Sequence, residues 1–153
     1  MSVVVRTAES PEERLAAWRI RERVFIDEQG IAEAIERDGL DGIAWHFVAW
    51  DSETAVGTAR VVGLDARNRP VPPAVATAVK IGRMAVLPSK RRLGIGKRLL
   101  DAALELARQN GLRRAELSAQ AYVVPFYEQA GFRVEGDAYV EAGIPHRHMS
   151  RAL

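Results

Sequence analysis

The chain has 153 residues, of which 48% are hydrophobic and 27% charged, with 22 Lys and Arg against 20 Asp and Glu. This size and balance are typical of one soluble globular domain and exclude a disordered or fibrous protein. The absence of cysteine excludes disulfides, a thiolate zinc site and a cysteine nucleophile. Neither a signal-peptide pattern nor a run of ~20 apolar residues occurs. We expect a single cytoplasmic domain over 1–153 that does not bind membranes.

The first half of the chain predicts a strand, a capped helix and an antiparallel strand pair. Val3–Val5 are β-branched, and Ser10-Pro11-Glu12-Glu13 has the residues of a capping box with proline at the first helical position. Apolar residues at three- and four-residue spacing extend this helix to about Phe25. The remaining elements of this half are an acidic loop with one helical turn over 27–42 and strands over 44–50 and 55–62.

The second half predicts a crossover helix and a final hairpin. In chain order we expect a proline-rich loop over 64–77, a strand over 79–86, a helix over 96–110, a strand over 115–119, a short helix over 124–130, and a hairpin from Phe132 that turns at Ala142-Gly143. The resulting order β-α-β-β-β-α-β-α-β-β predicts an α/β fold. Its sheet is mixed, mostly antiparallel, and has one crossover connection through the long helix.

A basic turn with two glycines separates the strand 79–86 from the long helix. Residues 90–98 hold five cationic side chains and no acidic one. Gly94 and Gly96 allow close approach to the unpaired amides at the helix start, which carry partial positive charge. This arrangement predicts a phosphate or pyrophosphate ligand.

Two common phosphate-binding motifs do not fit this turn. A P-loop needs glycine at position 91 and Ser or Thr at position 98, where Arg91 and Arg98 stand. The Rossmann pattern needs a third glycine where Leu99 stands. The pattern that fits is R-x-x-G-x-G, and an exposed basic helix start is the alternative.

This R-x-x-G-x-G pattern resembles the pyrophosphate-binding motif of the GNAT acyltransferases. Residues 121–132, which read AYVVPFYEQAGF, resemble the A-x-x-F-Y-E-x-x-G-F signature of the same family, and 81–86 resemble its central strand. The resemblance spans about residues 19–149. Three further segments, 23–29, 38–41 and 143–146, are similar to its bacterial ElaA-like branch.

The resemblance implies a GNAT-type sheet in which a splayed parallel strand pair forms the slot for acyl-CoA. The strand end would pair with the pantetheine arm, and an amide near Met84 or Ala85 would stabilise an oxyanion. The amides of residues 92–97 would hold the pyrophosphate, with Arg91, Lys97 and Arg98 adding charge around the phosphates. The implied cofactor-binding residues are Met84, Ala85, Val86, Arg91, Arg92, Leu93, Gly94, Ile95, Gly96 and Lys97.

The implied activity is acetyl-CoA-dependent N-acetylation of a primary amine on a small molecule or peptide. Tyr127 stands where the family places its general acid, and a phenol with a pKa of about 10 is protonated at neutral pH. The alternative for Tyr127 is an aromatic side chain that simply packs beside Phe126. Because the chain lacks cysteine, the acetyl group would pass directly from thioester to amine.

The general base is open, because the strand 79–86 contains no carboxylate. Candidates are Glu28, Asp38 and Asp41 in the acidic loop and His46 in the next strand. Each can equally be a solvated charge or, for His46, a satisfied strand residue. The acidic loop also predicts a cationic amine acceptor, on the strength of Glu28, Glu33, Glu36, Asp38 and Asp41.

Two further residues are candidates near the acceptor. Arg83 on the central strand faces either the substrate or a loop carboxylate, and His146 in the Gly-Ile-Pro-His turn is a candidate wall of the acceptor pocket. His146 and His148 alternate along a strand, so they share a face, but two histidines without a third ligand predict no metal site.

Two other classes of function can be compared with the enzyme. A non-catalytic acyl-CoA-binding or sensor domain is the alternative to the enzyme, because a strand carboxylate is missing. A nucleic-acid-binding domain is not expected, since the basic residues lack interleaved aromatics and a known module. A homodimer follows from family habit alone.

Overall fold

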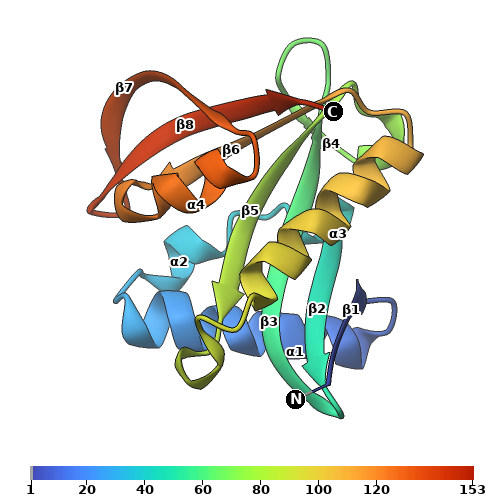
Figure 1. Cartoon of the computed structure of the whole chain (residues 1–153), viewed down its shortest axis with the longest axis vertical. Coiled ribbons are helices and arrows are strands. Elements are labelled where there is room, and N and C mark those ends of the chain that lie inside the picture. The colour runs from blue at the N-terminus through green and yellow to red at the C-terminus, as the bar shows by residue number, and fades with distance from the viewer. Residues whose placement is uncertain (1) are drawn as a thin grey trace.

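The computed structural model describes residues 2–153 as one twisted eight-stranded sheet with helices on both faces (Figure 1). The strands are β1 (Val3–Thr7), β2 (Trp45–Asp51), β3 (Thr54–Leu64), β4 (Pro70–Val71), β5 (Ala78–Val86), β6 (Arg114–Gln120), β7 (Arg133–Glu141) and β8 (Ile144–Ala152). The helices are α1 (Pro11–Arg21), the π-helix η1 (Glu22–Glu28), α2 (Glu33–Glu36), α3 (Ile95–Gln109) and α4 (Val124–Gln129). None of the helices in residues 2–153 is both long and apolar enough to cross a membrane.

The order of strands across the sheet is β1-β2-β3-β5-β6-β8-β7, with β4 paired to β3. Every pairing is antiparallel except β5 with β6, which α3 connects as a crossover. This confirms the predicted mixed sheet and its single parallel pair. The predicted capping box is also present, because the Ser10 side chain accepts from the Glu13 amide and the Glu13 side chain accepts from the Ser10 amide.

Two segments differ from the sequence prediction. The first helix does not run as a regular α-helix to Phe25 but widens into the π-helix η1 after Arg21. A π turn aligns residues five apart, and Ile20 and Phe25 accordingly pack in one cluster with Ala85. The expected loop 64–77 contains the short strand β4, where proline is tolerated because β4 lies at an edge.

The sheet is buried on both faces where β2 and β3 cross its centre. Phe47 and Ala49 of β2 belong to the large core cluster that contains the apolar face of α3, whereas Val48 packs with Ala17 of α1. This alternation follows from the two-residue period of a strand. The N-terminal part of the sheet is therefore a rigid support between α1 and α3.

A bulge in β5 and a short parallel ladder open the sheet at its middle. Val79–Ile81 pair with Ala115–Leu117, and no further β5–β6 pairs follow. The register against β3 shifts beside Ala59, where Arg83 has a φ of 47°. Because a bulge reverses the alternation of side chains, Ala85 faces η1 while Met84 packs on the core beneath α3. The splayed strand pair is thus present.

Candidate active site

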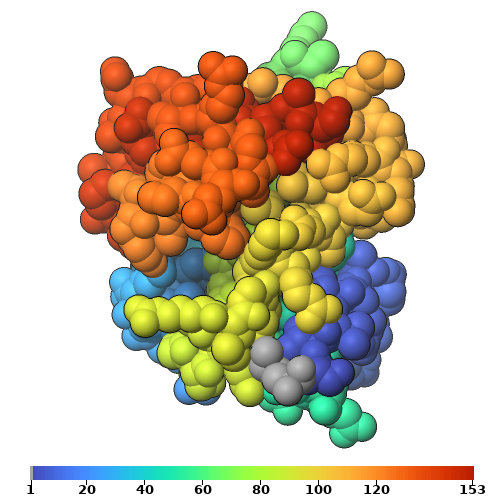
Figure 2. All heavy atoms as spheres, in the orientation of Figure 1, coloured from blue at the N-terminus to red at the C-terminus, as the bar shows by residue number. Residues whose placement is uncertain are grey.

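A cavity of about 950 Å³ lies where β5 and β6 separate. Its walls come from η1 and α2 on one side, and from the end of β6, α4 and β8 on the other. Figure 2 shows the surface hollowed between the orange and red C-terminal segment and the blue and yellow-green residues below it. Cavities of this size in the groove of a splayed sheet accommodate a cofactor or a drug-sized ligand.

The glycine turn forms one end of this cavity. Gly94 precedes α3 with a φ of 80°, and no side chain caps the first amides of the helix. A Cβ atom on Gly94 would meet nothing within 4 Å, and one on Gly96 would only touch the Phe126 ring at 3.5 Å. The backbone here is therefore open, as an anion-binding helix start requires.

The cations of the turn differ in how they are held. The Arg91 guanidinium donates two hydrogen bonds to Glu28, at 2.6 and 2.8 Å, and a third to the Val86 carbonyl. Lys97 pairs with Asp101 on the exposed face of α3. Within residues 2–153, Arg92 has no carboxylate partner within 4 Å. The turn thus keeps positive charge for an anion.

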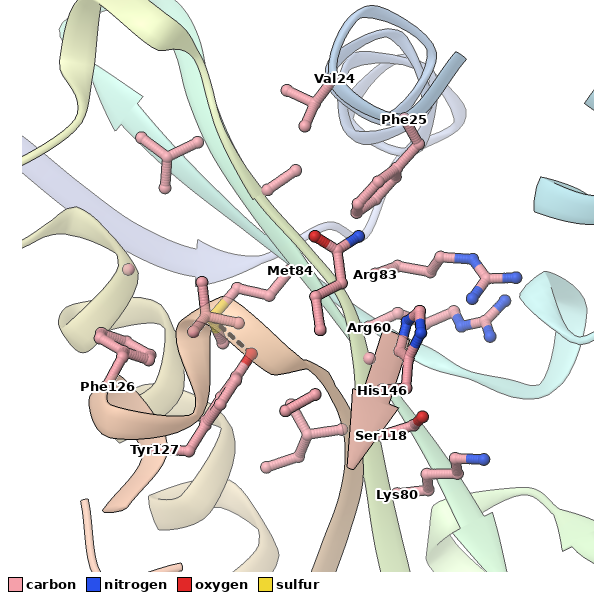
Figure 3. Close-up of a pocket in the computed structure, with 18 of the residues that line it drawn as sticks. Val24, Phe25, Arg60, Lys80, Arg83, Met84, Ser118, Phe126, Tyr127 and His146 are labelled. Carbon is pink, nitrogen blue, oxygen red and sulfur yellow. Dashed lines mark hydrogen bonds between the residues drawn. The ribbon is translucent and has the colours of Figure 1, made fainter. Parts of the chain in front are cut away.

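Tyr127 of α4 lines the cavity. Its ring makes edge contacts with Phe126 and Phe132, and its hydroxyl lies 3.8 Å from the Met84 sulfur (Figure 3). Burial, and then the proximity of Tyr122, raise the pKa of Tyr127 to about 12. The phenol is therefore protonated at neutral pH, and its hydroxyl can donate to a sulfur in the cavity.

A buried network of ion pairs forms the far wall of the cavity. Arg21 binds Glu36 through two hydrogen bonds, at 2.7 and 2.8 Å, and Arg83 lies 3.2 Å from the same carboxylate. Arg60 binds Asp38 at 2.7 and 2.8 Å, and Asp41 joins the network through Arg21 and Arg60. Glu36 and Asp38, two of the carboxylates that predicted a cationic acceptor, thus line the cavity but are already paired with arginines.

Despite partial burial, the pairing with Arg60 lowers the pKa of the Asp38 carboxyl. Partial burial acts to raise the pKa of its carboxyl, but the hydrogen bond and charge of Arg60 outweigh burial and lower the pKa to about 2. Burial lowers the pKa of His46, whose Nε2–H donates to the Asp41 carbonyl at 2.9 Å. His46 and Glu28 are not among the residues that line the cavity, whereas Asp38 is.

Most of the other predicted site residues meet in the cavity. Leu93 is exposed on the turn and outside the cavity wall, and Arg83 lines the wall while paired to Glu36 and Asp38. The predicted residues that line the cavity are Met84, Ala85, Val86, Arg91, Arg92, Gly94, Ile95, Gly96, Lys97, Tyr127, Asp38, Arg83 and His146.

The cavity also contains polar residues that were not predicted, among them Gln29, Ser118, Gln120 and Glu141. The Gln120 amide donates to Gln29 at 2.9 Å, which links the end of η1 to the end of β6 across the opening. Ser118 hydrogen-bonds Tyr139 and also donates to Glu141 at 3.4 Å. The two-residue alternation of the strand 115–119 places Ser118 on the same face as Gln120, and this signal could have found both.

Comparison with known proteins identifies the family. The acetyltransferase (GNAT) domain family matches residues 7–153. The chain is 32% identical to the N-acetyltransferase YjcF of Bacillus subtilis over 94% of this chain and 96% of that protein. It is 31% identical to ElaA of Escherichia coli, over 90% of this chain and 86% of ElaA.

Solved structures agree with this result. The crystal structure of Escherichia coli ElaA superposes with a TM-score of 0.82 at 27% identity, covering 98% of this chain and 99% of that one. An acyl-CoA N-acyltransferase from Pseudomonas aeruginosa gives a TM-score of 0.82 at 29% identity, covering 99% and 100%. The predicted resemblance is confirmed: the chain belongs to the GNAT acetyltransferase family, with ElaA among its homologues.

Proposed function

We propose that this protein is an acetyl-CoA-dependent N-acetyltransferase that transfers the acetyl group directly to a primary amine of a small molecule or peptide. The observation that carries the proposal is the separation of β5 from β6. It opens one cavity that is lined both by the glycine turn with its uncapped helix amides and by the protonated phenol of Tyr127. The similarity to YjcF and to the Pseudomonas aeruginosa acyl-CoA N-acyltransferase supports both the donor class and the amine acceptor.

The donor would lie along the free edge of β5. Beyond Ile81 this edge has no β6 partner, so the backbone of Met84–Val86 is available to pair with the amides of a pantetheine arm. The open amides at the start of α3 would hold the pyrophosphate, and Arg92, which has no carboxylate partner among residues 2–153, would add charge. The edge of β5 and the start of α3 would therefore contact the donor at both ends of its pantetheine arm.

The chemistry is an attack of the amine nitrogen on the thioester carbonyl carbon. A backbone amide near Met84 or Ala85 would stabilise the resulting oxyanion, and the carbon–sulfur bond would then break. Tyr127 would donate its proton to the departing thiolate, which its raised pKa permits at neutral pH.

Calorimetry with acetyl-CoA and coenzyme A, followed by turnover assays on a panel of amines and peptides, tests the proposal. We expect Tyr127→Phe to bind acetyl-CoA within about threefold of the wild type and to lose roughly 10²-fold in kcat. Tyr122→Phe, at a tyrosine that is 73% exposed, controls for loss of a phenol. Binding without turnover of any amine would favour the acyl-CoA sensor, and absence of binding would overturn the proposal.

A further inference from the structure

The mechanism above leaves unassigned the group that removes a proton from the acceptor ammonium. The carboxylates of the acidic loop are held by arginines, and His46 lies outside the cavity. A base must offer an unpaired lone pair in the cavity, on the side from which the amine reaches the thioester. His146 of β8 meets this requirement.

The ring of His146 is held in one orientation. It is 7% exposed and stacks on Tyr139, with ring centroids 5.9 Å apart and an interplanar angle of 25°. Its Nδ1 lies 2.7 Å from the Ile144 carbonyl oxygen, which can only accept a hydrogen bond. Nδ1 must therefore carry a proton, and in the neutral ring Nε2 must hold the lone pair.

The Nε2 atom of His146 has no hydrogen-bond partner among residues 2–153. The nearest carboxylate oxygen, Oε2 of Glu141, is 3.7 Å away, which is beyond hydrogen-bond distance but close enough to stabilise a positive ring. The same oxygen accepts from Ser118, so this carboxylate is tied to β6. A buried imidazole whose Nδ1 is fixed by a carbonyl and whose Nε2 makes no hydrogen bond to any of residues 2–153, with a carboxylate beside Nε2, is suited to act as a general base.

The position of His146 also suits the reaction. Figure 3 shows His146 and Ser118 on one side of β5, and Tyr127 with Phe126 on the other side. Both His146 and Tyr127 line the same cavity. A thioester bound in the opening between β5 and β6 would thus have an acid on its sulfur side and a base on its acceptor side.

We infer that His146 is the general base that deprotonates the acceptor amine through Nε2, with Glu141 stabilising the imidazolium that forms. The inference rests on the proposed function.

One proton of the ammonium moves to Nε2, the free amine forms the carbon–nitrogen bond, and the carbon–sulfur bond breaks. The thiolate takes the Tyr127 proton, the second proton of the amine nitrogen returns the phenolate to phenol, and the imidazolium releases its proton to water.

Several charged groups face this part of the cavity and set the field around His146. They are Glu141 from β7, Glu116 from β6, Lys80 and Arg83 from β5, and Arg60 from β3.

Two acceptors that differ in protonation test the role of His146. Hydroxylamine is largely unprotonated at neutral pH and needs no base, whereas ethylamine is protonated and does. We expect His146→Gln to lower kcat/KM for ethylamine by about 10²-fold. Transfer to hydroxylamine and affinity for acetyl-CoA should stay within about threefold of the wild type. His148→Gln, next on the same strand face but outside the cavity, is the matched control and should behave as the wild type.

A measurement that needs no acceptor completes the test. The ¹⁵N shifts of the His146 ring in the wild-type protein, assigned by comparison with His146→Gln, should show a neutral ring protonated at Nδ1. A ring protonated at Nε2, or an equal loss of activity toward both acceptors, overturns the inference. If the wild type acetylates no amine or peptide of the panel, the proposed function fails, and the ring tautomer alone then tests whether Nε2 of His146 holds a free lone pair.

Discussion

Arg21 and Glu36 form the most deeply buried ion pair of the protein, with side chains 2% and 1% exposed. A buried charge is costly unless its partner and its hydrogen bonds are in place, so each residue depends on the other. The pair also supports the far wall of the cavity, because Arg83 contacts the same Glu36 carboxylate and donates to its backbone carbonyl.

Removal of the Glu36 charge should therefore destabilise the fold strongly. We expect Glu36→Gln to lower the free energy of unfolding by about 3 kcal/mol, measured by urea denaturation, because Arg21 loses its buried partner and is left with Asp41, whose side chain is 40% exposed. Glu33→Gln, whose pair with Arg37 is exposed at 3.8 Å, should change it by less than about 0.5 kcal/mol. Equal effects of the two substitutions would contradict the buried network.

Asp38 should make the stability depend on pH in the acid range. Its folded pKa of about 2 lies below the ordinary value of 3.8, so the unfolded state binds a proton first as the pH falls. The associated stability, at most about 2 kcal/mol, is present above about pH 4 and lost as pH falls toward 2. Asp38→Asn should flatten unfolding free energy against pH in this window, and an unchanged slope would refute the assignment.

At the level of elements, the start of α3 combines two glycines with different structural roles. Gly94 has a φ of 80°, which side chains other than hydrogen disfavour, whereas Gly96 has ordinary helical geometry with room for a methyl group. Stability and binding should therefore separate at these two positions.

The two glycines allow a paired test of the proposal that this turn binds phosphate. Gly94→Ala should destabilise the fold by about 1 kcal/mol, because alanine resists a positive φ. Gly96→Ala should stabilise it by roughly 0.5 kcal/mol, through lower entropy of the unfolded chain. Gly96→Ala should nevertheless weaken coenzyme A binding about tenfold, equivalent to ~1.4 kcal/mol, because its methyl group blocks the open amides. Unchanged calorimetric affinity in Gly96→Ala would contradict a pyrophosphate at this turn.

The elements also show how far periodicity determines structure. The helix over 96–110, the strand over 79–86 and the hairpin turn at Ala142-Gly143 could be predicted closely, because each has a strong local pattern and a clear end signal. The π-helix η1 and the bulge at Arg83 could not. Both depend on packing against another segment, and neither has a local residue signal.

At the scale of the whole molecule, the end of η1 contacts both sides of the opening between β5 and β6. Glu28 binds Arg91 of the glycine turn, and the next residue, Gln29, binds Gln120 at the end of β6. Consecutive residues of one helix thus hold both sides of the cavity. A donor that occupies this opening would tie the same two parts of the sheet together.

Donor binding should therefore stabilise the entire fold. At a concentration of about 100 times its Kd, acetyl-CoA should add roughly 2.7 kcal/mol and raise the Tm by roughly 5–10 °C. Differential scanning fluorimetry measures the shift, and Gly96→Ala at the same ligand concentration should show a smaller one. A wild-type Tm that does not respond to acetyl-CoA would contradict donor binding in the cavity.

The sequence by itself determined the class of fold, through the order of its periodic segments along the chain. It also determined the glycine turn and the position of Tyr127, because each is encoded in a short stretch of adjacent residues. The tertiary structure alone decided which charges are free. The sequence does not show the ion-pair partners of Asp38 and Glu28. In the structure Asp38 binds Arg60, 22 positions away, and Glu28 binds Arg91, 63 positions away. The lone pair of His146 likewise depends on the carbonyl that holds its ring. Protonation and pairing are set by neighbours in space, which strand pairing and the bulge bring together.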